Sequence, residues 1–334
     1  REDTANLLQV IEEIPAGKVP AKKIGINQCA RIMTGAMVPE GADLVVMKED
    51  IQEAGPGRIL CTRHSSSTNI CYVGEDVKAG ELVLKNGDRI SPAHIAILAS
   101  VGCTNPLVYD RPTVAILSTG DELTEPGEIP GISKIRNSNS YQLASQLQQM
   151  GIAAEYLGIV PDDEALLRNA LEQALEKYQV ILISGGVSVG DFDFVPKILK
   201  QLEVNIPVHG MEVKPGKHLL FGERANHFVF GMPGNPVSSF VQFEVLVKPF
   251  LVAMMGNSAV DTYLYMPMEV DYVRKKADQL YFIPVTFTGQ GTVVPVDYHG
   301  SAHIHAYTRA QGILEIPKGV FILKKGETAC VRPI

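Results

Sequence analysis

The chain has 334 residues, more than one hydrophobic core usually serves, so we expect two or three domains. Hydrophobic residues make up 46% and charged residues 20%, which excludes a disordered chain and favours a folded, soluble protein. The formal net charge of -7 argues against a general nucleic-acid-binding protein. It still allows a local cluster of lysines to bind a small anion.

The cysteines and the apolar runs point to one cellular compartment. Five cysteines form no CxxC pair, which predicts reduced thiols in a cytoplasmic protein. We find no run of about 18 apolar residues and no signal peptide, so we expect no membrane partner. The sequence opens on Arg1 without a methionine, and we expect the first domain to be incomplete at its N-terminus.

The first third of the chain predicts small β-rich units. Residues 1–68 contain short apolar runs separated by turn residues, and strands are expected at 44–50 and 57–62. Residues 69–106 predict a connector domain with short β elements. A helix near 91–101 should follow them, because serine is a good N-cap and proline suits the first helical turn.

From residue 107 to 256 apolar strands alternate with amphipathic helices. This alternation predicts βαβ units, and therefore a mainly parallel sheet with helices on both faces. The expected strands are 113–119, 154–160, 179–184, 218–222 and 227–231. The expected helices are 140–150, 162–178, 194–202 and one that begins near Pro236. Residues 257–334 return to short strands without a convincing helix, and predict a small C-terminal β-domain.

Three loops leave the carboxyl ends of predicted strands, where open parallel sheets bind ligands. They read STGDE at 118–122, SGGVSVGDFDF at 184–194 and GMPGNPVSS at 231–239. Glycines let backbone N–H groups approach a ligand, and each following helix directs its positive end to the same place. Together the loops predict a cradle for an anion.

Charged residues of both signs accompany this cradle. The carboxylates are Asp121, Glu122, Asp162, Asp191 and Asp193. Carboxylates beside a phosphate pocket repel the ligand unless a cation lies between them, so the pattern favours Mg²⁺ held by carboxylates and substrate oxygens. Lys214 and Lys217 flank a Pro-Gly turn and could direct two ammonium groups at a tetrahedral oxyanion.

Each feature also has a purely structural interpretation. The pair Gly185 and Gly186 would suit a tight strand-to-helix turn, and Asp162 could cap its helix. The lysines could be solvated surface charges. Asn235 followed by Pro236 predicts an N-cap with proline at the first helical position, an arrangement that is compatible with ligand binding.

Four motifs in order and register resemble those of the MoeA family, which includes the E-domains of gephyrin and plant Cnx. They are STGDEL at 118–123, SGGVSVGDFDF at 184–194, KPGK at 214–217 and GMPGNPVS at 231–238. The strings NSNS at 137–140, IVPDD at 159–163 and GEDVKAGE at 74–81 agree with them. The resemblance extends over the whole chain.

The resemblance implies a fold and an activity. The α/β fold would have a mainly parallel, MogA/MoaB-like molybdopterin-binding domain at 107–256. It would be flanked by a lid domain at 1–68, a connector at 69–106 and a C-terminal β-domain at 257–334. The implied activity is a Mg²⁺-dependent molybdenum insertase that transfers molybdate onto adenylylated molybdopterin, cleaves the adenylyl phosphoanhydride and releases AMP. The resemblance also implies a homodimer and allows a MogA-like adenylyltransferase as partner.

The resemblance assigns roles residue by residue. Glu122, Asp162 and Asp193 match the family's acidic residues for Mg²⁺ and nucleotide cleavage, with Asp121 as a helper. Gly185, Gly186 and Ser188 match its pterin-phosphate loop, and Lys214, Lys217 and Ser238 match its molybdate-contacting positions. The remaining expected binding residues are Gly120, Asn139, Asn235 and Pro236.

Two departures and two alternatives accompany this assignment. A DGYAV-like segment that normally precedes Arg1 is absent, and His218 follows KPGK where the family has proline. A histidine there could reshape the molybdate pocket or make its affinity depend on pH. A MogA-like adenylyltransferase is one alternative, although it would not need residues 1–106 or 257–334. A gephyrin-like scaffold is the other, although it need not keep the carboxylates and both lysines.

Overall fold

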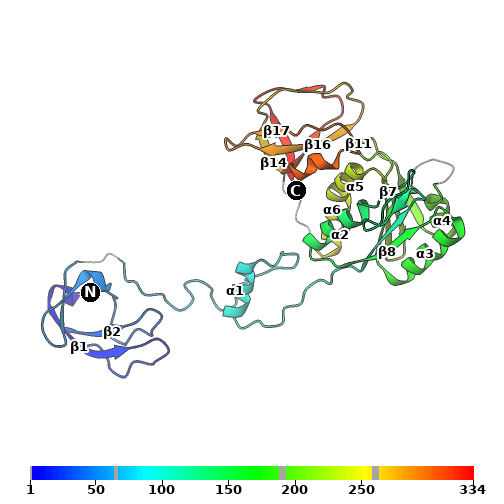
Figure 1. Ribbon diagram of the computed structural model, residues 1–334. Coiled ribbons are helices and arrows are strands. Elements are labelled where there is room, and N and C mark those ends of the chain that lie inside the picture. Colours follow the sequence, from blue (N-terminus) through cyan, green and yellow to red (C-terminus); the bar gives the residue numbers. More distant parts are fainter. Residues whose placement is uncertain (1, 64–66, 188–192, 258–262) are drawn as a thin grey trace. The chain divides into compact units, whose positions relative to one another are not determined.

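The computed structural model describes residues 2–63, 67–187, 193–257 and 263–334 (Figure 1). The chain divides into two compact units, residues 1–83 and residues 84–334. The first unit is a small β-structure. The second contains an α/β sheet followed by a C-terminal β-domain.

The first unit is built on a four-stranded sheet of order β2-β1-β4-β3. Its strands are β1 (Leu7–Ile14), β2 (Gln28–Ile32), β3 (Ile51–Glu53) and β4 (Arg58–Cys61), and a 3-10 turn, η1 (Glu2–Ala5), precedes them. The strand predicted at 57–62 is confirmed as β4. The strand predicted at 44–50 is wrong, because a 3-10 turn, η2 (Lys48–Asp50), occupies its second half. The three consecutive charged residues of this turn are poor strand formers.

The helix predicted near 91–101 is confirmed as α1 (Pro92–Ser100). The Ser91 hydroxyl accepts a hydrogen bond from the His94 N–H, and the His94 ring accepts one from the Ser91 N–H at 3.1 Å. This reciprocal pair closes a capping box, and Pro92 stands in the first turn as expected.

A six-stranded sheet of order β10-β12-β13-β9-β5-β8 forms the α/β domain. The strands are β5 (Val114–Thr119), β8 (Ala154–Val160), β9 (Val180–Ser184), β10 (Asn205–His209), β12 (Leu220–Arg224) and β13 (His227–Met232). β13, β9, β5 and β8 run parallel, whereas β10 and β12 form an antiparallel edge. The α/β fold class and all five predicted strands are confirmed. β10 was not anticipated.

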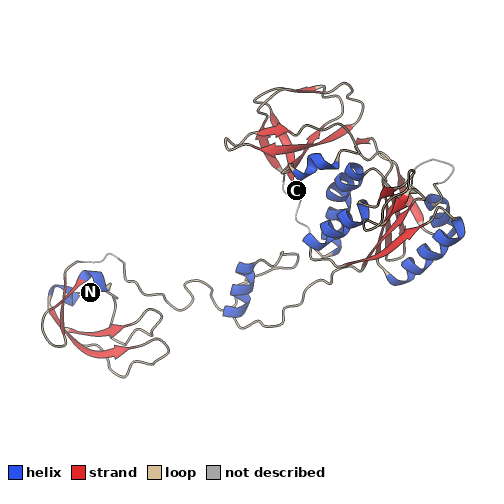
Figure 2. Ribbon diagram, viewed as in Figure 1, coloured by secondary structure: helices blue, strands red, loops and turns tan. Residues whose placement is uncertain are grey.

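Helices cover both faces of this sheet (Figure 2). They are α2 (Asn139–Gln149), α3 (Glu164–Lys177), α4 (Val195–Gln201), α5 (Pro236–Gln242) and α6 (Lys248–Met254), with a π-helical turn, η3 (Phe243–Val247), between the last two. Leu117 and Ile183 pack toward α3 and α4, while Ile116 and Leu182 pack toward α2, η3 and α6. Strand side chains alternate between two cores, as a doubly wound sheet requires.

The continuous helix of residues 236–254 is apolar enough and long enough, by length and composition only, to cross a membrane. Half of this apolar stretch is buried inside the protein. Phe243, Val247 and Leu251 are fully buried in the core beneath the sheet. We therefore interpret it as a core helix of the α/β domain.

The C-terminal β-domain is a sheet of order β11-β16-β18-β20-β14. Its strands are β11 (Val213–Lys214), β14 (Leu264–Pro267), β16 (Leu280–Phe287), β18 (Gly312–Ile316) and β20 (Thr328–Pro333). β17 (Val293–Pro295) pairs with β16, and β15 (Tyr272–Val273) pairs with β19 (Ile322–Leu323). The domain is β-rich as predicted, with one short 3-10 helix, η4 (Ile304–Thr308). β11 comes from the α/β part of the sequence, so it joins the two domains.

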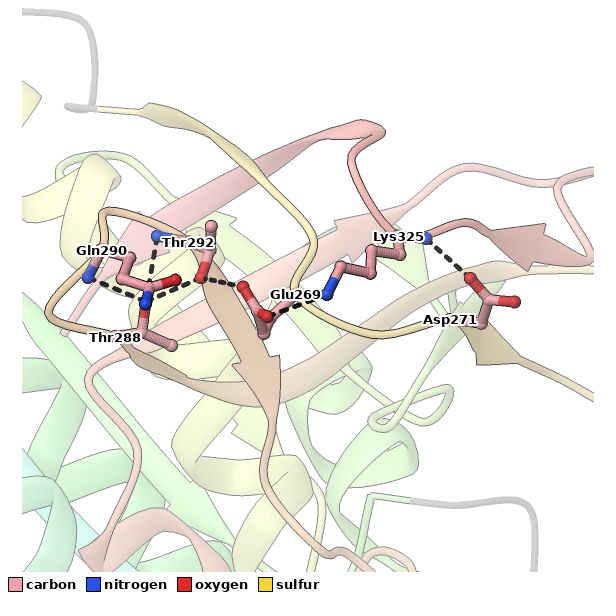
Figure 3. A network of polar contacts seen from close by, with 6 residues as sticks. All are labelled: Glu269, Asp271, Thr288, Gln290, Thr292 and Lys325. Carbon is pink, nitrogen blue, oxygen red and sulfur yellow. Dashed lines mark hydrogen bonds and ion pairs between the residues drawn. The ribbon is translucent and has the colours of Figure 1, made fainter.

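A polar network holds the turns at one side of the C-terminal domain (Figure 3). The Glu269 carboxylate accepts hydrogen bonds from Thr292 Oγ1 at 2.9 Å and from Lys325 Nζ at 3.1 Å. The Lys325 N–H donates to Asp271 Oδ1 at 2.7 Å. The Lys325 ammonium and the Thr292 hydroxyl hold the pKa of the Glu269 carboxyl below its ordinary value. Because Lys325 and Asp271 are exposed and Glu269 is only half-buried, the network contributes little to stability.

Candidate functional site

Thr119 and Asp162 meet at the carboxyl ends of β5 and β8. Thr119 Oγ1 donates a hydrogen bond to Asp162 Oδ1 at 2.8 Å. The Asp121 N–H donates to Asp162 Oδ2 at 3.3 Å, and the Asp162 N–H donates to Asp121 Oδ1 at 3.2 Å. The two aspartates therefore fix each other's loops at the edge of the sheet where ligands bind in this fold.

Asp162 is not the cap of α3, although the sequence allowed that interpretation. Asp163 is the N-cap residue, and its Oδ1 accepts hydrogen bonds from the N–H groups of Ala165 and Leu166, each at 2.9 Å. With the cap supplied by its neighbour, the Asp162 carboxylate can face the β5 loop.

Gly185 and Gly186 pack against Thr119, and each has a positive φ. A Cβ atom at Gly185 would lie 2.3 Å from the Thr119 carbonyl oxygen, and one at Gly186 would lie 2.7 Å from Thr119 Cγ2. Only glycine fits so close an approach. The first two residues of the loop after β9 therefore pack directly against the end of β5. The expected ligand residue Ser188 and the neighbouring Asp191 lie outside the described residues.

The remaining predicted acidic residues lie around this junction. Glu122 is exposed, and its carboxylate leans over Gly120, where a Cβ atom would lie 2.4 Å from Glu122 Oε2. Asp193 is half-buried, directly before Phe194 and the start of α4. Each therefore belongs to one of the ligand-side loops.

The expected Mg²⁺ ion would need oxygen ligands from these carboxylates. Within the described parts of the chain, no group of three His, Cys, Asp or Glu side chains is arranged to hold a metal ion. Asp121 and Asp162 nevertheless lie together, and Mg²⁺ commonly takes one or two protein carboxylates with substrate phosphate and water as its other ligands. This pair fits an ion shared with a substrate, and the three-carboxylate set of Glu122, Asp162 and Asp193 stays a prediction.

Asn139 connects the strand ends to the third glycine-containing loop. It is 7% exposed, and its Nδ2 donates to Ser184 Oγ at 2.9 Å and to the Gly234 carbonyl oxygen at 2.8 Å. Ser184 ends β9, and Gly234 precedes the first residue of α5 by two positions. The SGGV and GMPGN loops are thus held side by side by one amide.

A second polar chain supports the same region, and sequence reasoning missed it. Ser118 Oγ lies 2.7 Å from Ser140 Oγ, and Asn137 Nδ2 donates to Tyr156 OH at 2.8 Å. Tyr156 OH in turn donates to Glu125 Oε1 at 2.7 Å. Burial and the Glu125 carboxylate raise the pKa of the Tyr156 phenol. The DELTE segment is therefore anchored to β8 through Glu125.

A cavity of about 400 Å³ lies beside these loops. Its lining combines residues of the α/β domain with residues of the C-terminal domain: Val213, Lys214, Pro215, Gly216, Lys217, His218, Pro233, Asn235, Ser238, Lys276, Asp278, Gln279, Tyr281, Tyr298 and Ser301. The structure thus brings together four of the predicted binding residues, Lys214, Lys217, Asn235 and Ser238. Among the described residues, the predicted carboxylates Asp121, Glu122, Asp162 and Asp193 do not line this cavity.

The KPGK turn forms one wall of the cavity. The Lys214–Pro215 peptide bond is cis, and Gly216 has a φ of +102°. Lys214 is paired across β11 and β16 with Tyr281, and its Nζ lies 3.5 Å from Tyr281 OH and 5.1 Å from the ring centroid. The strand pairing therefore determines where the first lysine of the motif projects.

The start of α5 forms another part of the wall. Asn235 occupies the N-cap position and Pro236 the first helical turn, as predicted, but the Asn235 side chain makes no capping hydrogen bond. Ser238 is 3% exposed. Because it lines the cavity from the first turn of α5, its hydroxyl can face a bound anion.

The cavity is positively charged within a negatively charged protein. Among the residues that the structure describes, three lysines line it, Lys214, Lys217 and Lys276, against one carboxylate, Asp278. His218, the residue that departs from the family pattern, lies in the same wall. Concentrated positive charge at a concave surface attracts tetrahedral oxyanions.

The C-terminal residues of the cavity were missed from sequence. Lys276, Tyr281, Tyr298 and Ser301 come from a domain that showed no ligand motif. The basic run Arg274, Lys275, Lys276 was the one signal that could have drawn attention to it.

Comparisons with known proteins match three family models to successive parts of the chain. The family model for a probable molybdopterin binding domain matches residues 115–253. The models for the MoeA N-terminal region (domain I and II) and the MoeA C-terminal region (domain IV) match residues 1–102 and 270–334.

Similar proteins and structures cover nearly the whole chain. Molybdopterin molybdenumtransferase of Staphylococcus aureus is 33% identical over 323 residues, 96% of this chain and 77% of the relative. The protein of the same name from Staphylococcus epidermidis is 34% identical over 321 residues, 95% of this chain and 77% of the relative. The crystal structure of the molybdopterin biosynthesis MoeA protein from Pyrococcus horikoshii OT3 has a TM-score of 0.81 and 29% identity, and covers 100% of this chain and 84% of that one.

An α/β sheet with glycine-rich loops beside a lysine-lined cavity is typical of proteins that bind an anionic small molecule. The chain belongs to the MoeA family, the molybdopterin molybdenumtransferases, which are transferases of molybdenum cofactor biosynthesis.

Proposed function

We propose that this chain is a molybdenum insertase, which transfers molybdate onto adenylylated molybdopterin, cleaves the adenylyl phosphoanhydride and releases AMP. The observation that carries the proposal is the clasp made by Asn139. Its amide binds both Ser184 and Gly234, so it joins the carboxylate-bearing strand ends to the loop that leads into the lysine-lined cavity. A substrate held by the pterin loops would therefore have an oxyanion site next to it.

The lysine-lined cavity would hold molybdate. Lys214 and Lys217 supply the positive charge, and the Ser238 hydroxyl and the Asn235 amide supply neutral hydrogen bonds. Holding the oxyanion beside the pterin dithiolene turns a bimolecular encounter into a positioned reaction. The cavity binds by charge and shape, so tungstate, an oxyanion of similar size, would compete for it.

The strand-end loops would hold the adenylylated pterin. Gly120, Gly185, Gly186 and Ser188 would offer backbone N–H groups to its phosphates, and Pro236 would fix the start of α5 beside them. Glu122, Asp162 and Asp193, with Asp121 as helper, would hold Mg²⁺ together with substrate oxygens. When bound, the ion supplies Lewis-acid polarisation of the phosphoanhydride.

The family resemblance supports three further parts of the proposal. These are a cytoplasmic location, a homodimer, and a MogA-like adenylyltransferase partner that supplies the adenylylated pterin. Analytical ultracentrifugation tests the dimer, because a single species of one-chain mass at micromolar concentration contradicts it.

The decisive experiment is molybdate-dependent release of AMP from adenylylated molybdopterin with Mg²⁺. The chain is compared with Glu122→Gln and with Glu172→Gln, a matched change at an exposed position of α3. We expect release that needs molybdate and Mg²⁺, is lost in Glu122→Gln and persists in Glu172→Gln. Absence of release in the unmodified chain, or formation of adenylylated pterin from ATP, contradicts insertase activity.

A further inference from the structure

Arg274 is a buried cation in the C-terminal domain. It is 5% exposed, and its guanidinium donates hydrogen bonds to the carbonyl oxygens of four residues: Gln279, Ile316, Pro317 and Val320. In the part of the chain that the structure describes, none of its recorded partners is a carboxylate. Carbonyl dipoles weaken the field of such a cation, but they leave its net positive charge without an ion-pair partner in the described parts of the structure.

The guanidinium also stacks on an aromatic ring. Its central carbon lies 4.5 Å from the ring centroid of Tyr281, and Lys214 Nζ lies 5.1 Å from the same centroid. One phenol thus contacts a buried cation and a cation of the cavity wall. Both contacts belong to the cation–π range, and each restricts the orientation of the ring.

Arg274 determines the path of the loop that lines the cavity. Its bond to the Gln279 carbonyl ties together the two ends of residues 274–279. Its bonds to Pro317 and Val320 dock that loop on the neighbouring turn, where the Gly319 N–H also donates to the Ala277 carbonyl at 2.8 Å. Lys276, on this loop, lines the cavity.

We propose that Arg274 is a positioning residue for oxyanion binding. It holds Lys276 and the Tyr281 ring, and through the ring Lys214, toward the cavity, and its own buried charge strengthens the attraction for an anion. The inference rests on the proposed function, because it presumes that the cavity binds a tetrahedral oxyanion. It adds a residue that does not line the cavity and that no ligand motif contains.

Equilibrium dialysis with molybdate tests this inference on the whole chain. The variants are Arg274→Met, which removes both the charge and the hydrogen-bond donors, and Arg274→Lys. The lysine keeps the charge but loses the planar guanidinium that donates to several carbonyl groups at once. Lys325→Met removes one cation from the same domain at the exposed pair with Glu269, and is the matched control (Figure 3). Tyr281→Leu removes the ring while leaving Arg274 in place. Urea unfolding of each variant reports the stability separately.

We expect Arg274→Met to weaken molybdate binding about tenfold, since it removes one charge together with the hydrogen bonds that hold the loop. Arg274→Lys should weaken binding by only about threefold, since it keeps the charge and loses only the guanidinium geometry. Lys325→Met should bind as the unmodified chain does. Tyr281→Leu should weaken molybdate binding in a chain that stays folded. This variant therefore still tests the inference if Arg274→Met unfolds.

Three results overturn the inference. Unchanged affinity in Arg274→Met or in Tyr281→Leu removes the positioning role. Equal losses of affinity in Arg274→Met and Arg274→Lys, in step with equal losses of stability, reduce Arg274 to a purely structural residue. Absence of molybdate binding by the unmodified chain overturns the oxyanion cavity itself. That outcome is distinguished by appearing before any variant is made.

Discussion

The side-chain amide of Gln242 packs directly against Gly216 and occupies the space that a Cβ atom at this position would need. Such an atom would lie 2.3 Å from Gln242 Nε2, which donates to the Pro215 carbonyl oxygen at 3.0 Å. Gln242 is fully buried near the end of α5. The turn that carries Lys214 and Lys217 is therefore shaped by the core of the α/β domain as well as by its own proline and glycine.

We expect Gly216→Ala to lower stability by about 2–4 kcal/mol, because the residue has a positive φ and its methyl group would overlap a buried side chain. Molybdate affinity should fall as well, since the turn must move. Gly291→Ala is the control, because Gly291 has a φ of +77° with nothing within 4 Å of a built Cβ atom. Urea unfolding and equilibrium dialysis measure both effects. An equal cost at the two glycines would contradict the role of Gln242.

The hydroxyl of Thr119 makes a second testable contact, its bond to Asp162 Oδ1. Thr119→Val keeps the shape and removes the donor, whereas Thr119→Ser keeps the donor. We expect the valine variant to lose about 1–2 kcal/mol of stability and most of its AMP release, because Asp162 Oδ1 loses its hydrogen-bond donor. The serine variant should retain both. Equal activity of the two variants would show that the orientation of Asp162 does not depend on this bond.

Much of the α/β domain could be predicted because its sequence patterns are local. The strands β5 and β9 are continuous apolar runs, and every residue of both is buried. Helix α3 carries a regular apolar face, and its Leu167, Leu171 and Leu175 are buried in the core. The alternative interpretation of Asp162 as the helix cap is wrong by one residue, because two adjacent aspartates offer the same chemistry and only the turn geometry selects Asp163.

The cavity could be predicted only in part, because part of its wall comes from the C-terminal domain and depends on tertiary contacts. The KPGK and GMPGNPVS motifs indicated Lys214, Lys217 and Ser238 from sequence. β11 consists of two residues, too few to show any strand period, so its pairing with β16 was invisible. Without that pairing nothing in the sequence connects Lys276 to the KPGK turn.

We expect the folded protein to lose stability at alkaline pH because the phenol of Tyr298 ionises. Burial and the neighbouring Tyr272 phenol raise the pKa of Tyr298 from 10.0 to about 12. The folded protein therefore favours the neutral phenol, so this stabilisation is complete below pH 10 and is lost as pH rises through about 12. Tyr298→Phe cannot ionise and should reduce the alkaline loss by roughly 1–2 kcal/mol. Urea unfolding at a series of pH values above neutrality measures it.

The matched control for that titration is Tyr72→Phe, a change at an exposed position in the first unit. It should leave unchanged the dependence of the second unit's free energy of unfolding on alkaline pH. A Tyr298→Phe slope identical to that of the unmodified chain would mean that the phenol ionises equally in the folded and unfolded states. Tyr298 lines the cavity, so the neutral phenol also avoids placing a negative charge beside a bound oxyanion.

Lys275 and Lys276 are neighbours on one loop and both are exposed, yet only Lys276 is among the residues that line the cavity. Lys276→Met should weaken molybdate binding by roughly three- to tenfold and flatten its dependence on salt, because one charge is removed from the site. Lys275→Met removes the same charge one residue away and should change affinity by less than about twofold. Equilibrium dialysis at two ionic strengths separates the two cases. Equal effects of the two substitutions would mean that the cavity attracts anions through the general field of the loop, and that Lys276 makes no contact of its own.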